Sequence, residues 1–103
     1  MTDPREQKFQ QLAQQFPDAP MAHYSLGRLY CEQRRWAEAV PPLERACTLD
    51  TAYAAALVCL GDAYAGAGRT EEARRTYEGA KEVALQQKHE GLAQDIQDKL
   101  DFL

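Results

Sequence analysis

The feature that most constrains this chain is an internal repeat, because the sequence matches itself when it is shifted by 34 residues. Under that shift identical residues meet at informative positions: Leu26-Gly27 with Leu60-Gly61, Tyr30 with Tyr64, Ala39 with Ala73, and Ala46 with Ala80. A fixed period of this length is typical of proteins that stack one supersecondary unit several times. The chain is therefore expected to contain two copies of one structural unit.

Each copy contains two amphipathic stretches separated by a short turn. Apolar residues spaced three and four positions apart predict helices over about 21–33 and 36–49 in the first copy, and over about 52–65 and 71–86 in the second. The glycines of Gly66-Ala67-Gly68 supply the positive φ with which many helices end. Asp18 and Thr70 are the expected N-caps of the helices that follow them.

Two features inside these helices need a reason. Gly27 and Gly61 each cost about 1 kcal/mol relative to Ala in a helix interior, so a bulky ring or another backbone is expected to lie against both. Pro41-Pro42 falls inside the second helix of the first copy, where each ring removes a backbone donor. That helix is expected to have a distorted first turn or to start late.

The segments that flank the two copies also predict helices. Residues 8–16, with apolar Phe9 and Phe16, match the second helix of an incomplete preceding unit. Residues from about 90 to 103 have one apolar face and one polar face, as the end of a stacked array requires. We expect a single domain over 1–103, made of a leading helix (1–17), a first repeat (18–52), a second repeat (53–87) and a capping helix (88–103).

The repeated motif resembles that of the tetratricopeptide repeat family. That family shows Leu-Gly, then Tyr, then spaced Ala around a large residue. The first copy has Leu26-Gly27, Tyr30, Ala39, Leu43 and Ala46, and the second has Leu60-Gly61, Tyr64, Ala73, Tyr77 and Ala80. The family favours Trp where His23 and Leu57 stand, and Pro where Thr51 stands. The resemblance implies an all-α fold, a short right-handed α-solenoid of antiparallel helix pairs.

Composition argues against several classes of partner. With 12 Lys+Arg against 16 Asp+Glu, the net charge of -4 does not favour a nucleic-acid partner. The longest apolar run, 52–60, is far shorter than the ~20 residues that cross a bilayer. The polar, acidic start of the chain does not have the pattern of a secretory signal. We therefore expect a cytoplasmic protein that does not contact membranes.

The residue types that carry catalysis or bind metals are few and poorly spaced. Cys31, Cys47 and Cys59 match neither a redox motif nor a zinc motif, so they are expected to act as small apolar residues. His23 and His89 lie far apart in sequence, outside any metal-binding spacing. Because of this we expect neither an enzyme nor a protein that needs a metal or a cofactor.

The surface expected to carry function is a concave groove lined by the first helix of each unit, which in such a family receives a peptide or a helix. The helix faces that point away from the core hold Met21, Tyr24, Ser25, Arg28, Cys31 and Glu32, and then Ala55, Val58, Cys59, Asp62 and Ala65. Tyr24 is the expected anchor, because a rigid aromatic ring with a polar tip is a common hot spot. Arg28 and Asp62 are expected to steer the partner. The alternative is that this stripe is ordinary exposed helix surface on a spacer and binds no partner.

Two further hypotheses concern the kind of partner. Some family members hold the carboxylate at the end of a partner chain with a clamp of Lys, Asn and Arg, but the matching positions here carry Tyr24, Arg28, Cys59, Gly91 and Asp95. One cation is too few, so we expect an adaptor that binds a protein segment without a carboxylate clamp. The alternative is a self-assembly module that forms a homo-dimer, through the groove or through Leu100, Phe102 and Leu103.

Overall fold

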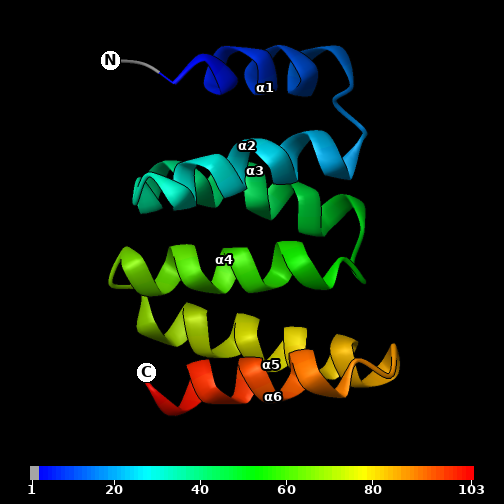
Figure 1. Cartoon of the computed structure of the whole chain (residues 1–103), viewed down its shortest axis with the longest axis vertical. Coiled ribbons are helices and arrows are strands. Elements are labelled where there is room, and N and C mark those ends of the chain that lie inside the picture. The colour runs from blue at the N-terminus through cyan, green and yellow to red at the C-terminus, as the bar shows by residue number, and fades with distance from the viewer. Residues whose placement is uncertain (1–2) are drawn as a thin grey trace.

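The computed structural model describes residues 3–103, which form six α-helices and no strand. The helices are α1 (Pro4–Gln15), α2 (Pro20–Glu32), α3 (Trp36–Leu49), α4 (Ala54–Gly66), α5 (Thr70–Gln86) and α6 (Glu90–Asp101). They follow one another down the long axis of a body that measures 35 × 26 × 20 Å (Figure 1). The all-α solenoid of helix pairs is confirmed.

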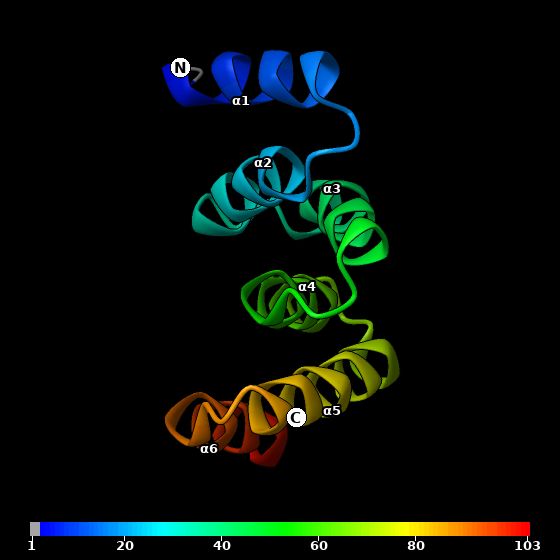
Figure 2. The same cartoon turned by 90° about the vertical axis from the view of Figure 1, so that its right-hand side faces the viewer.

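The helices lie in two layers. A view from the side places α2, α4 and α6 in one layer and α3 and α5 in the other, with α1 stacked above α2 (Figure 2). Each helix packs against the next one along the chain, and α2 also contacts α4 within its layer. The layer of α2, α4 and α6 is the one that the sequence predicts to line the groove.

The turns that follow α2, α4 and α5 all have the same geometry. Arg34, Gly68 and Lys88 all adopt a positive φ, of 59°, 80° and 61°. In each turn the next residue donates its backbone N–H back to the preceding helix, as Arg69 does to the Tyr64 carbonyl at 2.8 Å. These hydrogen bonds satisfy carbonyls that a helix end would otherwise leave unpaired. The backbone therefore repeats even where the residue types do not.

Both predicted N-caps are wrong. Ala19 is the N-cap of α2 and Arg69 that of α5, so Asp18 lies one residue too early and Thr70 is already helical. Pro20 presets the first helical φ of α2, and the tight turn before α5 brings the Arg69 carbonyl to the Ala73 N–H at 3.0 Å. Neither helix start has a hydrogen bond from a capping side chain, and backbone geometry defines both starts instead.

The late start expected for the helix with Pro41-Pro42 is also wrong, because α3 begins at Trp36 and runs unbroken to Leu49. The two rings leave the carbonyls of Ala37 and Glu38 without helical donors. Both of those residues are exposed, so water can satisfy the carbonyls.

The core alternates large and small side chains. Leu29, Leu43 and Ile96 are the largest fully buried side chains, and the repeated Ala positions around them are completely enclosed. A Cβ on Gly27 would lie 2.4 Å from Leu43 Cγ, and one on Gly61 would lie 2.4 Å from Tyr77 Cε1. Both glycines are therefore required by the close approach of the partner helix, with a ring in the second repeat and an aliphatic side chain in the first.

Candidate functional site

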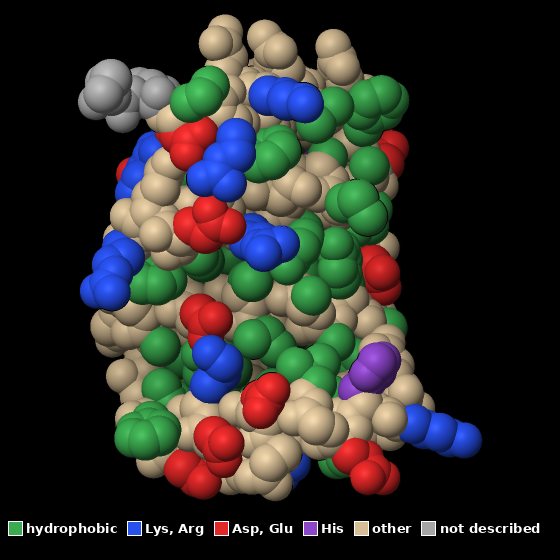
Figure 3. Space-filling model, in the orientation of Figure 1, with side chains coloured by type: hydrophobic (Ala, Val, Ile, Leu, Met, Phe, Trp, Pro, Cys, Tyr) green, Lys and Arg blue, Asp and Glu red, His purple; other side chains and the backbone are tan. Residues whose placement is uncertain are grey.

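Three adjoining hollows cross the face formed by α2, α4 and α6, where charged side chains of both signs run beside a hydrophobic patch (Figure 3). The upper pocket, about 200 Å³, is lined by Arg5, Phe9, Tyr24, Ser25, Arg28, Leu29 and Glu32. The central trough, about 470 Å³, is lined by Arg28, Cys31, Glu32, Trp36, Asp62, Ala65, Gly66, Tyr77 and Lys99. The lower hollow, about 440 Å³, is lined by Ala65, Tyr77, Asp98, Lys99, Phe102 and Leu103. Shared residues join them into one groove.

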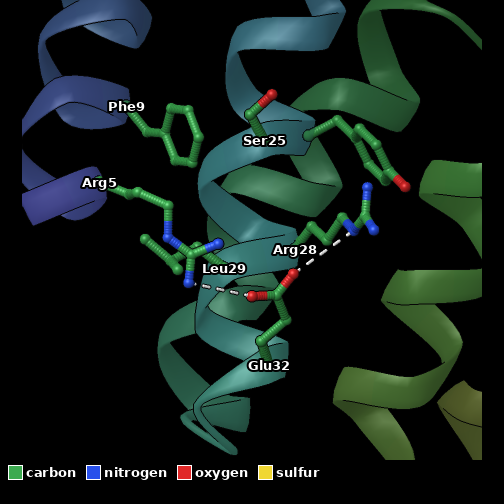
Figure 4. A pocket seen from close by; sticks show the side chains of 7 residues that line it. Arg5, Phe9, Ser25, Arg28, Leu29 and Glu32 are labelled. Carbon is green, nitrogen blue, oxygen red and sulfur yellow. Dashed lines mark ion pairs between the residues drawn. The ribbon is translucent and has the colours of Figure 1, made fainter. Parts of the chain in front are cut away.

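The upper pocket is built by α1 and α2. Phe9 and Arg5 reach from α1 toward α2, whose exposed face carries Ser25, Arg28 and Glu32 (Figure 4). The Glu32 carboxylate takes ion pairs from both sides, with Arg5 Nη2 at 3.2 Å and Arg28 Nε at 3.7 Å. Its charge is therefore shared between two guanidinium groups. The side chain of Arg28 is 61% exposed and lines both the upper pocket and the central trough.

Asp62 ties three helices together at the trough. Its carboxylate accepts a hydrogen bond from the Tyr77 hydroxyl of α5 and lies 3.1 Å from Lys99 Nζ of α6. Burial, and then the hydrogen bond to Asp62, raise the pKa of Tyr77, so the hydroxyl stays a donor at neutral pH. Asp62 therefore enters the groove already paired.

Trp36 forms a wall of the trough, although it belongs to the second layer. The indole lies so close to the end of α4 that a Cβ on Gly66 would sit 2.3 Å from its Cδ2 atom. The ring is only half-buried, which leaves part of it open to the trough. Glycine at position 66 is thus what lets the indole lie flat against the next repeat.

Tyr24 is less available than the sequence suggests. Its ring lies 5.0 Å from that of Tyr53, tilted by 45°, and the residue is half-buried. Burial, reinforced by the nearby Cys59, raises the pKa of Tyr24 to about 12. The ring therefore serves first as a contact between two repeats, with one edge lining the upper pocket.

The cysteines are protonated at neutral pH. Burial raises the pKa of Cys31 to about 12 and that of Cys47 to about 11, and it also raises the pKa of Cys59. A thiol held in its neutral form is a poor nucleophile and a poor metal ligand. All three cysteines are free and half-buried, and Cys31 Sγ lies 3.8 Å from the Cys59 carbonyl.

The predicted groove residues fall into two groups. Tyr24, Ser25, Arg28, Cys31 and Asp62 line the hollows, together with Glu32 and Ala65. Met21, Ala55, Val58 and Cys59 line none of the three. Val58 and Cys59 pack partly against the core, whereas Met21 and Ala55 are exposed.

Several lining residues were missed because they come from elements other than the two first helices. Trp36 and Tyr77 come from the second helices, Phe9 from α1 and Lys99 from α6. The only signal in the sequence was size: Gly66 and Ala65 are small, which leaves room for large side chains from their neighbours. No pattern within one helix shows which neighbour fills that room.

Arg35 and Arg69, the residues just before α3 and α5, are both paired with carboxylates. Arg35 pairs with Glu6 and Glu38 at 2.5 Å and lies 4.5 Å from the centre of the Tyr30 ring. Arg69 repeats the arrangement with Glu72 and the Tyr64 ring. Their charges are therefore largely compensated at the surface.

The described residues contain no group of His, Cys, Asp and Glu side chains that could hold a metal ion. Nor does the part of the chain with described coordinates include a helix long and apolar enough to cross a membrane. What the site offers is a groove with apolar walls and charged rims, which is an arrangement suited to binding.

Comparison with known proteins places the fold. A model of the tetratricopeptide repeat matches residues 6–56. The solution structure of protein BPP2914 from Bordetella parapertussis aligns with a TM-score of 0.81 and 24% identity, covering 98% of this chain and 87% of that one. No curated protein sequence matches the chain. At that level of identity the structural match speaks for the fold alone.

Proposed function

This chain belongs to the tetratricopeptide repeat family, and we propose that it is an adaptor that binds a segment of a partner protein in its concave groove. In this proposal it acts as a scaffold without catalytic activity of its own. Members of such a family present stacked helices whose concave surface receives a peptide or a helix. The two repeats, the leading helix and the cap then serve to hold that surface in shape.

The observation that carries the proposal is the continuity of the groove. Arg28 and Glu32 join the upper pocket to the central trough, and Ala65, Tyr77 and Lys99 join the trough to the lower hollow. An extended segment that follows the groove from α1 to α6 could therefore contact all three hollows. Each larger hollow has the volume of a typical ligand site.

The charges of the groove support a binding mode other than a carboxylate clamp. A clamp requires several free cations and amides on successive first helices. Among the matching positions named above, Arg28 is the single cation, and its side chain is 61% exposed. Lys99 is paired with Asp62, and Cys59 is a half-buried neutral thiol. We therefore propose that recognition depends on side chains of the partner and not on the end of its chain.

A selection of displayed random peptides tests this function. Peptides enriched on the wild-type protein should lose binding to Ala65→Arg, which places a long charged side chain between the trough and the lower hollow. Ala37→Arg is the matched control, because it adds the same side chain at an exposed position outside the three hollows. Failure to enrich any peptide, or equal binding to both variants, would contradict the proposal.

Self-assembly is the second candidate function, because Phe102 is 92% exposed beside the lower hollow. A ring of that size in water at the end of a groove favours contact with another apolar surface. Light scattering over a range of concentrations would reveal a dimer, and Phe102→Asp should dissociate it into monomers. A monomer at every concentration would contradict this second candidate.

A further inference from the structure

We propose that the central trough is the anchor site of the groove, and that its partner segment carries a large apolar side chain next to an acidic residue. The apolar side chain packs against Trp36, and the carboxylate binds the guanidinium of Arg28. This inference rests on the proposed function and adds to it the chemistry of the partner. It also moves the anchor from Tyr24, where the sequence had placed it, to the second layer of helices.

The apolar half of the inference follows from the walls of the trough. Trp36 supplies a half-buried indole ring, and Cys31, Ala65 and Gly66 line the space beside it with small groups. Tyr77, which is 3% exposed, closes the trough from the core side. The Cys31 thiol has its pKa raised to about 12 by burial, so it acts as an apolar group. A half-buried indole beside small residues leaves room for one large apolar side chain, which is a common form of interface hot spot.

The acidic half follows from the pairing of the rim charges. Asp62 is held by Tyr77 and Lys99, so neither member of its ion pair needs a partner. Glu32 already has Arg5 at 3.2 Å, and its contact with Arg28 is longer, at 3.7 Å through Nε only. Among the described residues that line the trough, Arg28 thus has the charge with the weakest pairing, and it is positive. Its complement is a carboxylate, which a guanidinium can bind through two parallel hydrogen bonds.

The charge at the opposite end of the groove indicates where the acidic residue does not bind. The lower hollow carries Asp98, whose carboxylate accepts a hydrogen bond from the Gln94 amide at 3.1 Å. An acidic residue of the partner would meet a like charge there and an opposite charge at Arg28. The acidic residue is therefore held toward α2, at the end of the trough away from Asp98.

The peptide selection proposed for the adaptor function also tests the inference if the library is displayed so that no peptide has a free carboxyl terminus. Enriched sequences should share Asp or Glu beside Leu, Ile, Phe, Trp or Met. The best peptide that contains no tryptophan is then synthesised with both ends blocked, once with its acidic residue and once with that residue replaced by the corresponding amide. Trp36 is the single tryptophan of the chain, so its emission should shift as the peptide fills the trough.

A double-mutant cycle isolates the contact between the acid and Arg28. Arg28→Gln should weaken binding of the acidic peptide between about threefold and tenfold, and leave binding of its amide version nearly unchanged. Added salt should weaken only the acidic peptide on the wild-type protein. Arg75→Gln, an exposed change on α5 away from the three hollows, should leave both peptides unaffected.

The outcomes separate the two proposals. Peptides that bind the groove, as judged by Ala65→Arg, but lack an acid or are insensitive to Arg28→Gln would overturn the inference and leave the adaptor function standing. The inference also fails, and the adaptor function stands, if Trp36 emission does not change on binding. A selection without enrichment contradicts the adaptor function, and the inference with it. Trp36→Ala, with circular dichroism as the check on folding, should abolish binding of the acidic peptide.

Discussion

The two repeats place different residues opposite the same glycine. In the first, Leu43 of α3 packs on Gly27 and ends inside the dry core. In the second, Tyr77 of α5 packs on Gly61 and continues to the groove, where its hydroxyl binds Asp62. One position therefore contributes packing alone in the first repeat, and in the second it also connects the core with the binding surface.

The groove residue after that glycine differs as well. Position 28 carries an exposed arginine and position 62 a paired aspartate, although both occupy the same place in the repeat. The backbone repeat thus gives two sites of equal geometry and opposite charge. Asp62 is held by α5 and α6, whereas Arg28 has one longer contact, with Glu32 of its own helix, so Arg28 is the more available of the two charges.

Truncation of the two large residues should produce the largest effects. Leu43→Ala is expected to lower the free energy of unfolding by about 2–5 kcal/mol, through lost burial and the cavity left behind. Tyr77→Ala should cost at least as much, because it also deprives Asp62 of a donor. Urea denaturation of both variants measures the difference. A smaller loss for Tyr77→Ala would show that the connection to the groove adds nothing to stability.

Replacing Gly27 or Gly61 by alanine should destabilise the protein by an amount that depends on how easily the facing side chain, Leu43 or Tyr77, can move. Gly61→Ala is expected to destabilise by about 1–3 kcal/mol, because the Tyr77 ring is tied to Asp62 and cannot move aside. Gly27→Ala should cost less, since Leu43 can change rotamer. Thermal unfolding of the pair would test this order, and equal losses would count against it. Gly79→Ala is the control, because nothing lies within 4 Å of its added methyl.

Removal of the Tyr77 hydroxyl should have a smaller effect that the first repeat cannot show. Tyr77→Phe keeps the ring and loses one hydrogen bond to a carboxylate, at a cost of about 1 kcal/mol. Lys99 remains beside Asp62 and limits the loss. The variant should also make Gly61→Ala better tolerated, and a double-mutant cycle measures that coupling. Strict additivity would contradict the idea that the hydroxyl stiffens the ring.

Cys31 should make the unfolding free energy depend on alkaline pH, which Ala65, its equivalent in the second repeat, cannot do. Because burial raises the pKa of Cys31 to about 12, the folded state keeps a proton that the unfolded chain loses near its ordinary value of 9.0. The stabilisation is complete below about pH 9 and declines as the pH rises toward 12. Cys31→Ala should flatten the fall in unfolding free energy over that range. An unchanged slope would mean that the thiol is not the group responsible.

The turns should give the smallest effect. Arg34 holds a positive φ of 59° where the second repeat has Gly68, so Arg34→Gly is expected to stabilise by about 0.5 kcal/mol. Gly68→Ala should destabilise by about 1 kcal/mol for the converse reason. Differential scanning calorimetry can resolve both shifts. If Arg34→Gly destabilises, contacts of the Arg34 side chain outweigh the backbone strain.

Much of the local structure was readable from the sequence. The approximate range 36–49 predicted for α3 agrees with its observed bounds, and the positive φ of Gly68 was expected from its type. The N-caps failed because the tight turns supply backbone partners, which residue preferences do not describe. The late start expected from Pro41-Pro42 is wrong, because Ala37 and Glu38, whose carbonyls lose their helical donors, are exposed residues that water can reach.

About half of the candidate site was readable in the same way. Arg28 and Asp62 were placed in the groove because a helix face follows from its period of 3.6 residues. Trp36 and Tyr77 were not placed there, because their position depends on how closely α3 and α5 approach α4. That distance is set by Gly66 and Gly61, each of which acts on a residue of a different helix.

The sequence by itself determined that this chain is a stack of helix pairs, since periodicity and repeat length are local properties that survive without a partner. Only the tertiary structure decided which side chains meet in the groove and which charge stays available there. Asp62 and Arg28 look alike in the sequence as exposed charges of opposite sign. Packing of α5 and α6 brings Tyr77 and Lys99 onto the first and leaves the second open, because pairing depends on contacts between helices distant in the chain.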